Sequence, residues 1–265
     1  MPQTSGQTVT PLPEPQRQRL GNGVPLVQLD LPEAPVLCLD FWCKAGSASE
    51  QTEESGMAHF LEHMVFKGST RLAAGEFDRR IEALGGSSNA ATGFDDVHFH
   101  VLIPPDGAAE ALDLLLDLVL QPRLEAGDFA MERQVVLEEL AQSEDQPEEV
   151  AFQELLRQAC PNHAYGLPIL GRREALEAHR PDAMAGFHQR HYRADRCCLA
   201  MAGPLQGLGL SERLQDSGLA GLIPASAPNP VQPLTLHSGE ATLELQRLEA
   251  ARLLIAWRLP GAADQ

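Results

Sequence analysis

Two histidines and a glutamate fall within five positions of GMAHFLEHMVFKGST, residues 56–70. Successive residues of an α-helix turn by about 100°, which places Glu62 about 60° to one side of His59 and His63 about 40° to the other. The three polar side chains therefore share one narrow face, opposite an apolar back made of Phe60, Leu61, Met64 and Val65. Two imidazoles one turn apart can bind one divalent ion, and the glutamate between them can hold a water molecule there.

The same pattern has an ordinary explanation, because an amphipathic helix can carry His and Glu on its solvated face. A second motif favours the metal site. In ERQVVLEE, Glu132 and Glu139 are seven residues apart and share one face of another predicted helix. That pair alone would indicate a solvated face. A catalytic zinc typically takes three protein ligands and keeps one position for water, so together the motifs make Glu139 the third Zn2+ ligand and Glu132 an outer residue that orients a histidine.

A mixture of strands and helices must position these motifs. The alternating segment PVLCLDFWCKAG and the apolar run CCLAMAG predict strands, and Asn22-Gly23 predicts a hairpin. The segment SSNAATGFDDVHFHVLIP reads as a loop that enters a strand, and its His98 and His100 are expected to be surface or edge residues. Helical spacing recurs in GEFDRRIEALGG, AAEALDLLLDLVLQP, EAGDFAMERQVVLEELAQSED, PEEVAFQELLRQAC and PDAMAGFHQRHY.

Composition divides the 265 residues into four parts. Residues 1–18 are rich in Pro, Gln and Thr and predict a disordered leader. Residues 19–222 form the domain that carries the metal motifs, and residues 223–235 are a Pro-rich linker. Residues 236–265 include the strand-like segment ARLLIAWRLPG, which predicts the beginning of a second, truncated domain, since a strand needs neighbours.

The net charge of −17 argues against nucleic acid and anionic membranes as partners, because both attract basic surfaces. No apolar run is long enough to span a bilayer, and the first residues lack the apolar centre of a signal peptide, so a cytoplasmic location is expected. The cysteines are odd in number and lack zinc-binding CxxC spacing, which indicates reduced, structural thiols.

These motifs together make the chain resemble the amino-terminal half of the inverted zincins of peptidase family M16, which includes pitrilysin, insulinase and mitochondrial processing peptidase. The resemblance covers about residues 20–204. It is carried by GMAHFLEHMVFKGS, ERQVVLEE, SNAATGFDDVHF, HAYGLPILG and HYRADRCCLAMAG. It implies an α+β fold, with a mixed, largely antiparallel sheet and helices packed on one face. The activity it implies is that of a zinc metalloendopeptidase acting on extended peptides.

The resemblance also implies a role for each matching residue. His59, His63 and Glu139 would bind Zn2+, and Glu62 would be the catalytic base. Glu132 would lie in the shell outside the ligands. The substrate backbone would be bound by strand addition at Asn89, Ala90, Ala91 and Thr92.

Two features depart from the family pattern. The family usually has an acidic residue after the glycine of its last strand, where this chain has Gly203-Pro204. Full members also have a second, similar half that closes a chamber over the site. The resemblance therefore implies such a half, either in the same full-length chain or as a partner subunit in a homodimer or heterodimer. The alternative is a zinc-binding but inactive half that acts as a subunit or scaffold, although retention of both histidines and the base favours activity.

Overall fold

The computed structural model describes residues 13–224, 233–246, 248 and 250–260. The strands are β1 (Gln16–Arg19), β2 (Pro25–Asp30), β3 (Leu37–Cys43), β4 (Ser87–Thr92), β5 (Val97–Ile103) and β6 (Cys197–Gly203). The α-helices are α1 (Met57–Val65), α2 (Glu76–Ala83), α3 (Ala108–Leu120), α4 (Ala126–Glu144), α5 (Pro147–Ala159), α6 (Arg173–Ala178), α7 (Pro181–His191) and α8 (Leu210–Gln215). Short 3₁₀ helices are η1 (Ser47–Ser49), η2 (Thr52–Glu54), η3 (Pro105–Gly107) and η4 (Ala164–Gly166).

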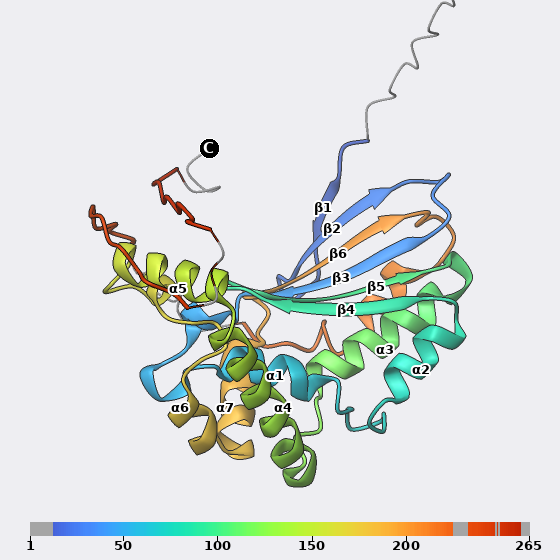
Figure 1. Cartoon of the computed structure of the whole chain (residues 1–265). Helices are drawn as coiled ribbons and strands as arrows, with labels where there is room; N and C mark the ends of the chain where they lie inside the picture. The colour runs from blue at the N-terminus through green and yellow to red at the C-terminus, as the bar shows by residue number, and fades with distance from the viewer. Residues whose placement is uncertain (1–12, 225–232, 247, 249, 261–265) are drawn as a thin grey trace, which may run out of the picture.

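The strands form one sheet in the order β1-β2-β6-β3-β5-β4. The β2–β6 pair is parallel and the other pairs are antiparallel. Figure 1 shows α1, α2, α3 and α4 on one face of this sheet, with β4 at the edge above α1. The predicted α+β fold, a mixed and largely antiparallel sheet with helices on one face, is therefore confirmed.

Alternation along the central strands builds the core. In β3 the odd-numbered residues, from Leu37 to Cys43, are buried, while Cys38, Asp40 and Trp42 are half-buried on the opposite face. The buried side chains belong to the same hydrophobic core as the apolar back of α1, which α4 contacts through the rings of Phe60 and Phe129, 4.5 Å apart. Full burial of one such aromatic side chain contributes about 1.5–3 kcal/mol. The core thus fixes α1 between the sheet and α4.

The hairpin predicted at Asn22-Gly23 joins β1 to β2, and Gly23 adopts a φ of 91°, which favours glycine. Residues 16–18, expected in the disordered leader, instead belong to β1 and pair with β2. Their side chains are all exposed, so the strand is held by backbone hydrogen bonds and leaves no apolar pattern in the sequence. Residues 1–12 lie outside the described part of the chain.

The segment 87–92 was predicted by its residue pattern to be a loop, and that prediction is wrong. It forms β4, which pairs with β5 along its whole length. Small polar residues give little β signal, but the neighbouring strand supplies backbone partners that the local sequence does not reveal. The family resemblance had implied an edge strand here, as observed.

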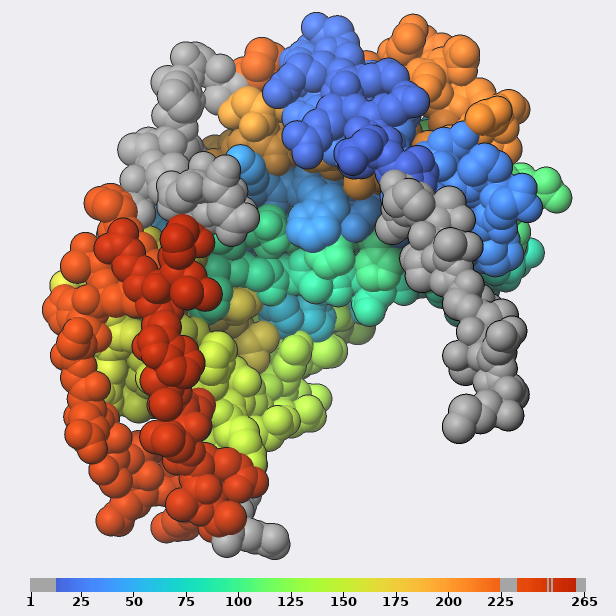
Figure 2. All heavy atoms as spheres, turned by 90° about the horizontal axis from the view of Figure 1, so that it is seen from above, coloured from blue at the N-terminus to red at the C-terminus, as the bar shows by residue number. Residues whose placement is uncertain are grey.

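The prediction of a strand in ARLLIAWRLPG is also wrong, because residues 250–260 contain no strand. Leu253 and Trp257 are 85% and 74% exposed. A strand requires a neighbour with which to pair, and no described strand lies beside this segment. Figure 2 shows the segment beside α5 instead, and Nη2 of Arg252 lies 3.6 Å from Oε1 of Glu148 in that helix. Earlier in the same tail, the backbone N–H of His237 donates to the carbonyl of Ala159 over 2.9 Å.

The remaining boundaries, including the linker at 223–235, stay predictions, and residues 225–232 are outside the described ranges. The sequence did not predict the short helices α6 and α8, which have six residues each. Within the described residues, no helix combines the length and the apolar character needed to cross a bilayer.

Candidate metal centre

The start of α1 is fixed by its surroundings. Gly56 precedes the helix with a φ of 83° and lies against Gly171, where an added Cβ would come within 2.5 Å of the Gly56 Cα. The carboxylate of Glu50 accepts hydrogen bonds from the backbone N–H groups of Gly56 (2.9 Å) and Ala58 (2.8 Å). These contacts satisfy donors that a helix leaves free at its first turn. These hydrogen bonds hold the first turn of α1, the turn that carries His59.

The three predicted metal ligands meet between α1 and α4. Oε2 of Glu139 lies 3.6 Å from Nε2 of His59 and 3.3 Å from Nε2 of His63. One ligand atom from each residue lies within 4.8 Å of the others. Ligand atoms that share a tetrahedral zinc ion are about 3.4 Å apart, given arms of roughly 2.0–2.2 Å. The donor set and its spacing therefore fit a shared zinc ion.

His59 is held in the protonation state that a ligand requires. It is 8% exposed, and burial, together with the neighbouring His63, lowers its pKa to about 4. The imidazole is therefore neutral near pH 7, with a lone pair free for a metal. The Nε2 atom of His59 faces Glu139. The other ring nitrogen, Nδ1, is buried and has no hydrogen-bond partner among the described residues.

Glu132 orients the second histidine. It is 6% exposed, and its Oε1 lies 2.9 Å from Nδ1 of His63. This carboxylate accepts a hydrogen bond from the tautomer that carries the hydrogen on Nδ1, and that tautomer leaves Nε2 as the nitrogen available to a metal. The other oxygen, Oε2, lies 2.5 Å from Nζ of Lys67. The sequence analysis assigned Glu132 its outer position. It did not identify Lys67, which follows His63 by four residues, as a partner of Glu132.

Glu62 lies on the same face of α1 and contacts the sheet. Its Oε2 accepts a hydrogen bond from the Thr92 hydroxyl over 2.5 Å. Burial raises the pKa of Glu62, and the Thr92 hydrogen bond offsets part of that rise. A carboxylate with raised proton affinity beside a metal site suits general base catalysis near neutral pH. The contact also gives Thr92 a position that sequence reasoning did not foresee, since it supports Glu62.

Strand β4 presents one free edge, because its pairing partner among the described strands is β5 alone. The N–H of Ala90 donates to the side-chain oxygen of Asn89 over 2.9 Å, as expected for a donor on an open edge. Asn89 and Ala91 are exposed and point to the face opposite the helices, since Thr92 points toward α1. An extended peptide could add to this edge.

The HAYG segment supports the β4–β5 turn. The Tyr165 hydroxyl donates to the carboxylate of Asp95 at 2.6–2.8 Å, and its ring lies 5.0 Å from that of Phe94. Nδ1 of His163 accepts a hydrogen bond from the backbone N–H of Tyr165 over 3.2 Å. These contacts agree with the structural role predicted for His163. The described cysteines are all free.

The sequence profile of the insulinase peptidases, peptidase family M16, matches residues 29–173, more than half of the chain. The chain belongs to the insulinase family. A relative in Mycobacterium leprae, named as a zinc protease, is 30% identical over 248 residues, which is 92% of this chain and 56% of the relative. The beta subunit of mitochondrial-processing peptidase from Neurospora crassa is 32% identical over 213 residues, 80% of this chain and 44% of that subunit.

A solved protease from Helicobacter pylori has a similar fold, with a TM-score of 0.78 and 26% identity. The match covers 85% of this chain and 55% of the Helicobacter protein. This member of the insulinase family therefore spans about half the length of the relatives it matches.

Proposed function

We propose that this chain carries the metal centre and catalytic base of a zinc-dependent endopeptidase. One observation carries the proposal: the donor atoms of His59, His63 and Glu139 are spaced for a shared ion, with Glu62 on the same helix face. The names of the relatives, which include zinc proteases and a processing peptidase, support it.

The chain's own residues supply the proton transfers. A zinc ion held by the three ligands would lower the pKa of a water molecule toward ~7 and polarise the peptide carbonyl. Glu62 would take a proton from that water during attack and then pass it to the departing amine nitrogen. The raised pKa of Glu62 suits a group that must hold this proton between the two steps. The Thr92 hydroxyl would keep the Glu62 carboxylate in place.

We infer that substrates are extended peptides that add to the free edge of β4 at residues 89–92. Backbone hydrogen bonds would provide much of the affinity, so conformation would matter more than a fixed sequence. The Ala90 N–H is held by the Asn89 side chain. That side chain would have to swing away for a peptide carbonyl to bind this donor.

A second, similar half would complete the enzyme, either in the same full-length chain or as a partner subunit. The coverage of relatives by about half of their length supports this proposal. Positioning the substrate and excluding water both depend on walls around the metal. Residues 1–265 alone should therefore bind zinc but cleave peptides poorly. The same coverage also supports the alternative, in which the chain is an inactive half that serves as subunit or scaffold.

The decisive experiment compares Glu62→Gln with the wild type in a form that contains the second half. Glutamine keeps the size of the side chain but cannot accept the proton, so cleavage of an unstructured peptide should fall at least about 100-fold. Zinc content, measured by elemental analysis, should remain at wild-type level, whereas His63→Ala should lose the ion shared by His59, His63 and Glu139. Near wild-type cleavage by Glu62→Gln would refute the role of Glu62. A zinc-loaded wild type without chelator-sensitive cleavage would favour the scaffold alternative.

A further inference from the structure

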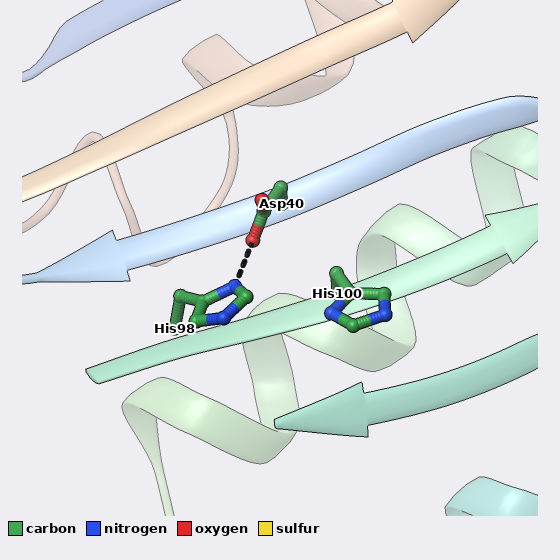
Figure 3. Close-up of side chains that lie close together, drawn as sticks. All are labelled: Asp40, His98 and His100. Atoms are coloured by element: carbon green, nitrogen blue, oxygen red, sulfur yellow. Dashed lines mark hydrogen bonds and ion pairs between the residues drawn. The ribbon is translucent and has the colours of Figure 1, made fainter. Parts of the chain in front are cut away.

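The open face of the sheet carries a second group of side chains able to bind a metal. His98 and His100 are two residues apart on β5, so both point to one face. Asp40 of β3 is paired directly with His100, and its Oδ1 lies 3.0 Å from Nδ1 of His98. Figure 3 shows the three side chains rising from the same side of the sheet. The two histidines had been expected at a surface or edge, but they are half-buried on an interior strand.

We propose that Asp40, His98 and His100 bind a divalent transition-metal ion, at a site separate from the centre between α1 and α4. One ligand atom from each residue lies within 4.8 Å of the others. An ion with tetrahedral geometry holds its ligand atoms about 3.4 Å apart. The contact between His98 and Asp40 already has this scale, and rotation of the His100 side chain would bring in the third donor.

The environment holds the donors in place before an ion arrives. The side chains of His98 and Asp40 are 23% and 20% exposed. The indole of Trp42 stacks on the His98 ring with centroids 4.4 Å apart. On a near-parallel plane, the centroid of the His100 ring lies 5.5 Å from that of His98. Side chains restricted in this way lose less conformational freedom on binding. The site is therefore partly organised, yet still open to solvent on one side.

The charge balance favours a cation. Asp40 forms its ion pair with His98, and no lysine or arginine of the described residues lies within ion-pair distance of its carboxylate. A half-buried carboxylate without a permanent positive partner gains from a nearby metal ion. The net charge of −17 for the whole chain adds to the attraction.

The donor chemistry selects the class of ion. Two imidazoles and one carboxylate suit Zn2+, Co2+, Ni2+ and Cu2+, whereas Mg2+ and Ca2+ prefer oxygen ligands throughout. Two half-buried cysteines, Cys38 and Cys198, lie on the same face. Neither thiol belongs to the group of ligand atoms that lie within 4.8 Å of one another, which consists of Asp40, His98 and His100. The nitrogen and oxygen donors therefore define the site.

Zinc stoichiometry tests the proposal without any assay of activity. The wild type should bind two zinc ions per chain, measured by equilibrium dialysis with elemental analysis. The double variant His63→Ala, Glu139→Gln should keep one. Adding His100→Gln to that variant should weaken the remaining site at least about 100-fold, while adding His237→Ala, a histidine outside both clusters, should leave it unchanged.

Fluorescence supplies a local readout. The chain has two tryptophans, Trp42 and Trp257, so Trp257→Phe leaves the indole that stacks on His98 as the sole tryptophan. Paramagnetic Cu2+ or Co2+ bound beside it should quench its emission in the variant that lacks the first site. The quenching should saturate at one ion per chain and disappear on addition of His100→Gln.

His100→Gln keeps the contacts of His98 with Asp40 and Trp42, so the fold should survive, which circular dichroism would verify. Should that variant not fold, Asp40→Asn in the same background provides the equivalent test. A single zinc per wild-type chain would overturn the proposal. Residual binding or quenching that persists undiminished in the folded His100→Gln or Asp40→Asn variant would overturn it as well.

Discussion

Replacement of Glu132 by alanine is expected to weaken zinc binding although Glu132 is not itself a ligand. The buried carboxylate holds Nδ1 of His63 at 2.9 Å and Nζ of Lys67 at 2.5 Å. Without it, the imidazole loses the partner that fixes its tautomer and ring orientation. Loss of such an outer partner typically costs 10–100-fold in metal affinity, which is about 1.4–2.7 kcal/mol.

The structure indicates which part of the loss belongs to His63. Lys67 is 34% exposed, so its ammonium can reach water when Glu132 is removed, and the cost of leaving it unpaired is small. Lys67→Met is the matched control, because it removes the same ion pair but keeps the contact between Glu132 and His63. We expect Lys67→Met to change zinc affinity less than about threefold, within the range of a partly exposed ion pair.

The assay is competition for zinc against a chromophoric chelator at fixed pH, with thermal unfolding of each metal-free variant as a control for global damage. Glu132→Ala should bind zinc at least about tenfold more weakly than the wild type and at least about threefold more weakly than Lys67→Met. Equal affinities for the wild type and Glu132→Ala would refute the orienting role. Equal losses in both variants would assign the effect to the ion pair instead.

Three further outcomes are expected. Thr92→Val removes a hydrogen bond that lowers the pKa of Glu62, so the acid limb of the pH–rate profile should move to higher pH, with zinc content unchanged; an unmoved limb would contradict this. Burial and nearby arginines lower the pKa of His191 to about 4, so the folded state favours the neutral imidazole. The free energy of unfolding should therefore fall as the pH drops from about 6.5 to 4. His191→Gln should reduce that fall by about 2 kcal/mol in urea titrations at several pH values. Gly171→Ala should destabilise the protein by about 2–4 kcal/mol, because Gly171 has a φ of 84° and an added Cβ would meet the backbone before α1. Gly75→Ala is the control, since Gly75 has a similar φ but open space around it, and it should cost about 1 kcal/mol. Equal midpoints of the two variants in denaturant would refute the steric argument.

Local patterns predicted the elements whose side chains carry the signal. The helix around His59 and His63 follows from a period that one segment contains by itself, and the alternation in β3 likewise. The meeting of these histidines with Glu139 depends on the packing of α1 against α4, which spacing alone does not specify. That step rested on combining the two motifs with the usual ligand set of a catalytic zinc, and the family resemblance implied the same three ligands.

The elements that sequence reasoning missed are held by partners distant in the chain. Strands β1 and β4 have polar or small side chains and exist because β2 and β5 supply hydrogen bonds. The cluster of Asp40 with His98 and His100 depends on the register between β3 and β5, which sets residues 60 positions apart side by side. The alternation of His98 and His100 along one strand was a usable signal for their shared face, but not for Asp40.

The edge of β4 that would receive a peptide is also a surface through which two molecules could associate. An unpaired strand edge pairs with any extended chain, including another copy of itself, and so invites aggregation. Here the Asn89 side chain occupies the Ala90 donor, and the strand SSNAAT lacks the large apolar side chains that stabilise stacked sheets. The high negative charge of the chain adds repulsion between copies. The edge can therefore stay open in a concentrated solution, and a substrate must compete with an internal amide instead of a neighbouring molecule.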